Sequence, residues 1–128
     1  MNVKGFAHCG LYVPKLEETV QFYIDVFGAK NLGFFEISSR GCWLQIGEDI
    51  LEVFQSSDLG TGCFKHIAIA CDDVDGLYER ALQFGAGAMI APKDAVLELL
   101  EPAKVRLAFV TGINEEQIEL FHIYGAND

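Results

Sequence analysis

The sequence has little positive charge. It carries nine Lys and Arg residues against nineteen Asp and Glu residues, and its formal net charge is −10. The basic residues are scattered singly, so the basic patch of a nucleic-acid-binding domain is missing. The same shortage argues against an anionic membrane surface as a partner. We therefore expect neither nucleic acid nor membrane among the partners of this chain.

Long apolar runs and paired cysteines are also missing. No stretch approaches the roughly 18 apolar residues that a membrane span needs, and residues 1–5 lack the apolar segment of a secretory signal. None of the four cysteines forms a C-x-x-C pair, which removes the usual zinc-knuckle and redox motifs. We expect a cytoplasmic protein, with residues 1–128 as one domain around one core.

What the chain does have is an internal repeat. Each half opens with a short apolar segment that carries a histidine, at residues 5–13 and again at residues 64–71. An amphipathic helix pattern follows each segment and ends at a glycine, Gly28 or Gly85. Three strand patterns then follow in each half, at 32–38, 42–46 and 50–54, and at 87–91, 105–110 and 117–123. Residues 94–101 fit either a strand or a helical turn.

This order predicts an α+β fold of two βαβββ modules, at about 4–56 and 63–124. A single module would leave one face of its sheet bare. Two modules together can curl around a shared concave face.

Four polar residues interrupt the apolar patterns at matching positions in the two modules. His8 and His66 lie in the first strands, and Glu52 and Glu119 lie in the last strands, within Ile-Leu-Glu-Val-Phe and Gln-Ile-Glu-Leu-Phe. A single histidine or glutamate in a strand is more often packed in the core or solvated. Their recurrence at matched positions favours a function for all four residues.

The chemistry of these side chains predicts a metal. Two carboxylates about 4 Å apart repel each other by roughly 4 kcal/mol at an effective dielectric constant near 20. A bound proton or cation must therefore offset this repulsion. Two neutral imidazoles and two carboxylates neutralise a divalent ion and leave two positions of an octahedral shell open. Mixed nitrogen and oxygen ligands suit Ni, Zn, Co, Mn or Fe, and open positions indicate a catalytic rather than a structural site.

Aromatic residues share the strand faces that carry these four residues. They are Phe6, Tyr12, Phe54, Phe64 and Phe121. They fit the wall of an apolar substrate pocket, and core packing is the competing interpretation. Trp43, in a middle strand, is ambiguous in the same way, while His122 is expected to point away from Glu119.

At these positions the chain resembles the vicinal oxygen chelate superfamily, also called the glyoxalase/bleomycin-resistance/dioxygenase fold. The resemblance covers nearly the whole chain. It is carried by His8-x-x-Leu11-x-Val13-Pro14-x-Leu16 with Phe22-Tyr23 and Gly28, by His66-Ile67-Ala68-Ile69 with Asp73-Val74-Asp75, and by Ile118-Glu119-Leu120-Phe121. It implies two βαβββ modules that form an incomplete barrel around a metal site.

The resemblance also implies a ligand set and a reaction. His8, Glu52, His66 and Glu119 match the His, Glu, His, Glu pattern of glyoxalase I (lactoylglutathione lyase)-like members. The implied activity is that of a lyase or isomerase, which transfers a proton on a hemithioacetal or another vicinal-oxygen substrate through an enediolate. Glu119 or Glu52 would be the base, and a thiol such as glutathione would be the cosubstrate.

Two further functions stay open at this point. One is a methylmalonyl-CoA-type epimerase, which typically has Gln where Glu52 stands. The second is a non-catalytic small-molecule binding protein of the bleomycin-resistance kind, in which a metal is optional. We expect a homodimer in every case, with the site either inside one chain or shared across a swapped dimer.

Overall fold

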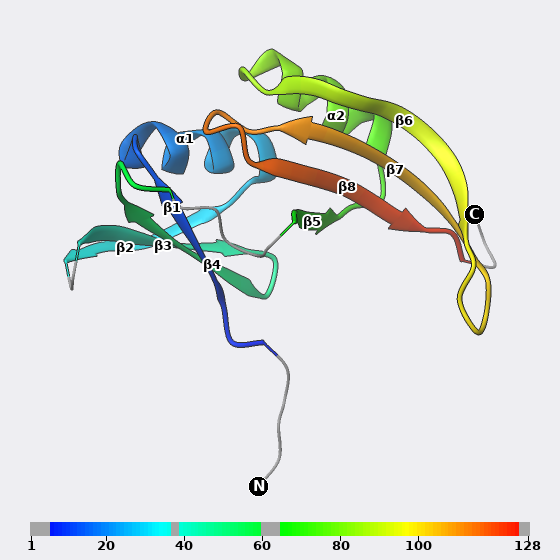
Figure 1. Cartoon of the computed structure of the whole chain (residues 1–128), viewed down its shortest axis with the longest axis horizontal. Coiled ribbons are helices and arrows are strands. Elements are labelled where there is room, and N and C mark those ends of the chain that lie inside the picture. The colour runs from blue at the N-terminus through cyan, green and yellow to red at the C-terminus, as the bar shows by residue number, and fades with distance from the viewer. Residues whose placement is uncertain (1–5, 37–38, 60–64, 126–128) are drawn as a thin grey trace, which may run out of the picture. The chain divides into compact units, whose positions relative to one another are not determined.

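The structure, a computed structural model, describes residues 6–36, 39–59 and 65–125. The chain divides into two units, Met1–Gly62 and Cys63–Asp128, which are described one at a time. Each unit runs strand, helix and then three strands, and its four strands form one open sheet (Figure 1). The predicted α+β class with two βαβββ modules is thereby confirmed.

The first unit is built from β1 (Cys9–Val13), α1 (Leu16–Phe27), β2 (Lys30–Glu36), β3 (Arg40–Ile46) and β4 (Asp49–Gln55). Its sheet order is β1-β4-β3-β2, with β1 parallel to β4 and the other neighbours antiparallel. The first strand begins later than the predicted residues 5–13, so Phe6 and His8 come before the ladder of hydrogen bonds.

Helix α1 forms where the sequence predicts it. Its apolar stripe buries Leu16, Val20 and Tyr23, which are at most 4% exposed. The helix ends at Gly28, whose φ of 68° is a left-handed conformation that favours glycine. The backbone N–H of Gly28 donates to the carbonyl of Ile24 at 3.0 Å.

The two faces of the first sheet differ. Five residues on the helix-covered face are at most 5% exposed: Val13, Cys42, Leu44, Leu51 and Val53. Residues on the other face alternate with them along each strand and include Trp43, Glu52 and Phe54. Gly41 leaves room on this face for the ring of Phe35, because a Cβ at Gly41 would lie 2.6 Å from that ring.

The second unit is built from β5 (Ile67–Ala70), α2 (Val74–Gln83), β6 (Gly87–Leu97), β7 (Ala103–Thr111) and β8 (Gln117–Ile123). Its sheet order, β5-β8-β7-β6, repeats that of the first unit, with β5 parallel to β8. The Asp73 side chain accepts a hydrogen bond from the backbone N–H of Gly76 at 2.9 Å and so caps the N-terminus of α2.

Strand β6 settles the first half of the ambiguous segment 94–101. It continues to Leu97 and pairs with β7 across two register shifts, and residues 98–101 lie in neither a strand nor a helix. On the α2 side of this sheet, Ala108, Val110, Ile118 and Leu120 are fully buried. In the part of the chain that the structure describes, no helix is long and apolar enough to cross a membrane.

Candidate functional site

The first unit brings His8 and Glu52 together on the sheet face away from α1. Glu52 lies at the centre of β4 and pairs with Gly10 of the parallel strand β1. His8, two residues before Gly10, falls on the same face. Its Nε2 lies 3.6 Å from Oε1 of Glu52, and the two side chains are 38% and 16% exposed.

Trp43 completes this group. It lies directly opposite Glu52 in the antiparallel pair β3–β4. Its indole Nε1 donates a hydrogen bond to Oε2 of Glu52 at 2.5 Å, and its ring centroid lies 5.5 Å from that of His8 at an interplanar angle of 44°. The two oxygens of Glu52 therefore have different neighbours, Trp43 and His8.

The second unit brings His66 and Glu119 together in the same way. Glu119 lies in β8 between Ala68 of β5 and Phe109 of β7. Nε2 of His66 lies 3.1 Å from Oε1 of Glu119, and the side chains are 29% and 13% exposed. The rings of His66 and Phe109 meet edge to face, with centroids 5.3 Å apart.

The two pairs thus occupy equivalent positions in the two sheets. In each module, the histidine lies two residues before the residue that pairs with the glutamate in the parallel strand. An aromatic residue lies opposite the glutamate in the antiparallel strand. The aromatic residue differs, because Trp43 carries an N–H donor and Phe109 carries none. This difference falls on the side chain that touches the histidine ring in each unit.

The donor atoms of each pair suit a divalent metal. Two ligand atoms that each lie about 2.1 Å from one ion are about 3.0–3.4 Å apart in octahedral or tetrahedral geometry. The separations of 3.1 and 3.6 Å lie near that range. Among the described residues no group of three or more His, Cys, Asp or Glu side chains that could hold a metal is found. Each unit brings two candidate ligands together, and the predicted four-ligand site stays a prediction.

Two of the five predicted pocket aromatics form a cluster in the first unit. The ring centroids of Tyr12 and Phe54 are 6.2 Å apart, and Phe35 meets Phe54 edge to face at 5.4 Å. Phe35 was not among the residues predicted from sequence, although its position opposite Gly41 in the β2–β3 pair places it on this face.

The remaining three aromatics differ among themselves. Phe121 lies two residues after Glu119 in β8 and is partly exposed, on the same face. Phe6 precedes β1 and is 97% exposed, so it is not packed among the described residues of its unit. Phe64 lies outside the described residues.

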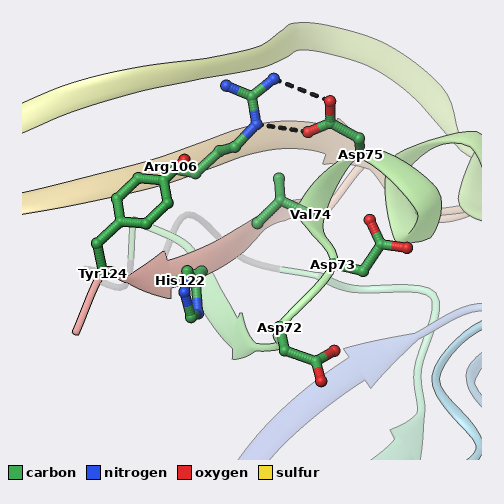
Figure 2. Close-up of a pocket in the computed structure, with 7 residues that line it drawn as sticks. All are labelled: Asp72, Asp73, Val74, Asp75, Arg106, His122 and Tyr124. Atoms are coloured by element: carbon green, nitrogen blue, oxygen red, sulfur yellow. Dashed lines mark hydrogen bonds and ion pairs between the residues drawn. The ribbon is translucent and has the colours of Figure 1, made fainter. Parts of the chain in front are cut away.

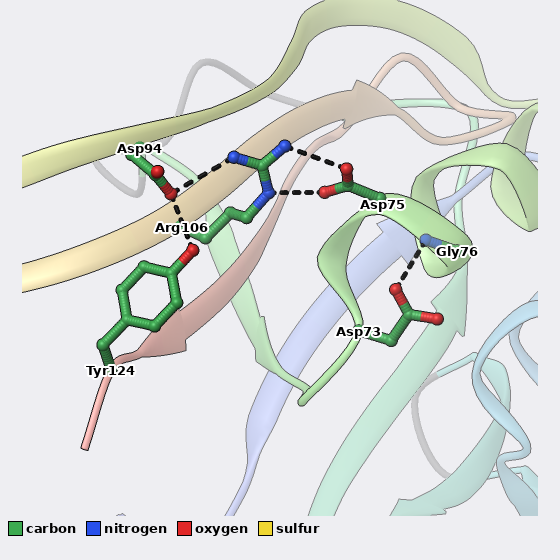
Figure 3. A network of polar contacts seen from close by, with 6 residues as sticks. All are labelled: Asp73, Asp75, Gly76, Asp94, Arg106 and Tyr124. Atoms are coloured by element: carbon green, nitrogen blue, oxygen red, sulfur yellow. Dashed lines mark hydrogen bonds and ion pairs between the residues drawn. The ribbon is translucent and has the colours of Figure 1, made fainter. Parts of the chain in front are cut away.

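The helix-covered side of the second unit carries a separate polar network. Arg106 binds both oxygens of Asp75, at 2.6 and 2.9 Å, and also donates to Asp94 at 3.2 Å (Figure 3). Tyr124 donates its hydroxyl to Asp94 at 2.7 Å. The hydrogen bond from Arg106 lowers the pKa of Asp75, and the hydrogen bonds from Tyr124 and Arg106 lower the pKa of Asp94.

Beside this network lies an open pocket of about 290 Å³ (Figure 2). Its lining residues are Asp72, Asp73, Val74, Asp75, Arg106, His122 and Tyr124. His122 pairs with Arg106 and alternates with Glu119 along β7–β8, so it lies on the opposite face from Glu119 as expected. The Arg106 guanidinium is already bound by two carboxylates here, which fits a structural ion pair.

The two βαβββ modules with equivalent His–Glu pairs indicate the class of protein to which this chain belongs. Residues 5–106 match the Glyoxalase/Bleomycin resistance protein/Dioxygenase superfamily. The chain belongs to this superfamily, as its sequence motifs indicated.

Solved structures share the fold. The fosfomycin resistance protein FosX from Listeria monocytogenes is 19% identical, with a TM-score of 0.75 and 98% of each chain covered. FosX from Mesorhizobium loti is 22% identical, with a TM-score of 0.72, over 93% of this chain and 91% of that one. A mutant of the Listeria protein, 18% identical with a TM-score of 0.70 over 93% of this chain and 90% of its own, was solved with Mn(II) and 1S,2S-dihydroxypropylphosphonic acid.

Proposed function

We propose that this protein is a metal-dependent lyase or isomerase of the glyoxalase I type. Its substrate is a small molecule with two adjacent oxygens, such as a hemithioacetal. The observation that carries this proposal is the recurrence of one His–Glu pair at the same register position in both modules. A core histidine or a solvated glutamate would have no reason to recur as a pair.

The metal ligands in this proposal are His8, Glu52, His66 and Glu119. The separations within each pair suit two ligands of one ion, and side chains of this kind favour a divalent transition metal. When bound, the metal supplies Lewis acidity to the two substrate oxygens. The two modules belong to one domain in this proposal, and the pairs meet either within one chain or across a homodimer.

The remaining chemistry belongs to the protein. Glu119 takes a proton from a substrate carbon and returns it to the neighbouring carbon, so no net proton is consumed. A positioned general base contributes typically 10²–10⁴-fold to the rate. His66, with Nε2 3.1 Å from Oε1 of Glu119, lies beside this carboxylate as the second metal ligand of its module. Tyr12 and Phe54, whose rings are 6.2 Å apart, form the apolar wall that the first module contributes beside the substrate.

A second candidate is suggested by the structural neighbours. Fosfomycin resistance proteins share this fold, and one of them was solved with Mn(II) and a phosphonic acid. Fosfomycin is therefore a substrate to test beside the hemithioacetals. An acyl-CoA is tested as well, because an epimerase of this superfamily would act on it, and metal-free binding of a small molecule is the outcome expected of a resistance protein without catalysis.

The test is an activity assay on protein of known metal content. Hemithioacetals formed from a 2-oxoaldehyde and several thiols, glutathione among them, are offered together with fosfomycin and an acyl-CoA. Turnover of a hemithioacetal that is abolished by a chelator and restored by Ni, Co, Mn or Zn supports the proposal. Metal-bound protein that turns over only fosfomycin or the acyl-CoA would replace it with that activity.

A further inference from the structure

We propose that Trp43 is a positioning residue for Glu52. Its indole N–H holds one carboxylate oxygen and leaves the other beside His8, where it would be available to a metal. The inference deepens the proposed function and rests on it, because it takes Glu52 as a metal ligand.

The geometry around Glu52 is specific. The Trp43 Nε1 atom donates a hydrogen bond to Glu52 Oε2, and the two atoms are 2.5 Å apart. The same indole lies against the His8 ring at 5.5 Å. One side chain therefore contacts both members of the His–Glu pair, on the sheet face that carries them.

This contact matters because a free glutamate side chain samples several rotamers. A carboxylate ligand that already accepts a hydrogen bond loses less freedom when the metal binds. Removing such a partner from a metal site typically costs 10–100-fold in metal affinity or activity. Trp43 is 37% exposed, so removing its indole leaves no large buried cavity.

The second module provides an internal comparison. Phe109 occupies the position of Trp43 but has no N–H to donate to Glu119. The repeat therefore gives Glu52 a hydrogen-bond donor in the neighbouring strand, where Glu119 faces Phe109. We assign Glu52 to the fixed ligand and Glu119 to the glutamate that turns toward the substrate proton.

The first arm of the test measures metal affinity. Metal-free wild-type protein and the Trp43→Phe variant, which copies the second module, are titrated with Mn²⁺ and Co²⁺ by calorimetry. The variant is expected to bind about 10–100-fold more weakly, while its melting temperature stays close to the wild-type value. The matched control, Phe109→Leu, removes the other aromatic ring without changing any donor and is expected to leave the affinity close to that of the wild type.

The second arm uses the fact that Trp43 is the only tryptophan of the chain. Its emission in the wild-type protein is expected to change on addition of Co²⁺, with the midpoint found by calorimetry. This arm needs no variant, so it holds even if Trp43→Phe folds poorly.

The outcomes separate this inference from the proposed function. Wild-type protein that binds Co²⁺ without any change in emission overturns the placement of Trp43 at the site. A Trp43→Phe variant with wild-type affinity overturns the positioning role and leaves the metal site intact. Wild-type protein that binds no metal overturns both proposals.

Discussion

Trp43 of the first module and Phe109 of the second lie at the same register position. Each is directly opposite the glutamate of its module in the neighbouring antiparallel strand. Each ring also contacts the histidine of its own pair. The modules are thus alike in the residues proposed to bind metal and unlike in the residue that supports them. This relationship makes the two glutamates chemically distinct.

The role of Glu119 is tested by Glu119→Gln. The amide keeps the shape of the side chain and an oxygen that can bind metal, but it takes up a proton poorly. We expect kcat to fall by about 10²–10⁴-fold, the contribution of a general base. Metal content is measured on the same sample. Turnover near the wild-type rate with metal still bound would reject Glu119 as the base, and Glu52→Gln is the matched comparison.

The close approach at Gly41 predicts a loss of stability. A Cβ there would lie 2.6 Å from the Phe35 ring and 2.8 Å from the backbone oxygen of Val53. We expect Gly41→Ala to lower the free energy of unfolding by about 1–3 kcal/mol, as overpacking typically does. In contrast, a Cβ at Gly10 meets only the backbone oxygen of Glu52, at 4.0 Å.

Gly10→Ala is therefore the matched control, and it copies Ala68 of the second module. Urea unfolding of both variants measures the difference. Equal stability of the two variants would show that the sheet face near Phe35 adjusts freely to the added methyl group.

The core of the second module gives a third prediction. Leu120 is fully buried on the α2 side of β8, next to Glu119 but on the opposite face. We expect Leu120→Ala to cost about 2–5 kcal/mol, as buried Leu→Ala changes do. The control is Ile123→Ala at the 57% exposed end of the same strand, expected to cost much less. Similar losses in urea unfolding would contradict the described burial.

The network around Arg106 predicts a dependence of stability on pH. The pKa values of Asp75 and Asp94 are lowered in the folded protein from the ordinary value of 3.8. The stabilisation is therefore complete above pH 3.8 and is lost as the pH falls through the lower, folded-state pKa values. In Arg106→Gln the guanidinium that lowers both values is absent.

The measurement is the melting temperature of the two proteins from about pH 7 down to about pH 2.5, a range that spans the titration of the carboxylates. The wild-type advantage is expected to be constant near neutral pH and to shrink below pH 3.8. Both carboxylates are exposed, so the advantage is expected to be small and to decrease with added salt. An advantage that grows on acidification would contradict the assignment of this ion pair.

Because of the repeat, most of the fold could be predicted from the sequence. Alternation and helical periodicity predicted α1, with Gly28 at its end, and all the strands of both modules. The predictions were wrong or undecided at the ends of strands, where pairing with a neighbouring strand sets the bounds. The strand predicted at residues 5–13 begins at Cys9, where its pairing with β4 starts. Residues 94–97 fit two conformations in the sequence because only their pairing with β7 decides between them.

The candidate site could be predicted from the sequence in part. Matching positions identified the two histidines and two glutamates, and the structure pairs them within each module. From the sequence, Trp43 stays ambiguous between a pocket wall and core packing, although the two-residue Gly47–Glu48 turn sets a register that places it opposite Glu52. The sequence pattern alone does not reveal a hydrogen bond between side chains, because it depends on that register and on the rotamer of each side chain.

The central claim is that the His–Glu pairs of both modules hold one ion. The most direct measurement is the number of divalent metal ions per chain, by elemental analysis after dialysis, in wild-type protein and in His8→Ala, His66→Ala and His122→Ala. We predict about one ion per chain in wild-type protein and in His122→Ala, and a loss of metal in each of the other two variants. Wild-type protein without metal, or metal retained when either His8 or His66 is removed, would contradict the claim.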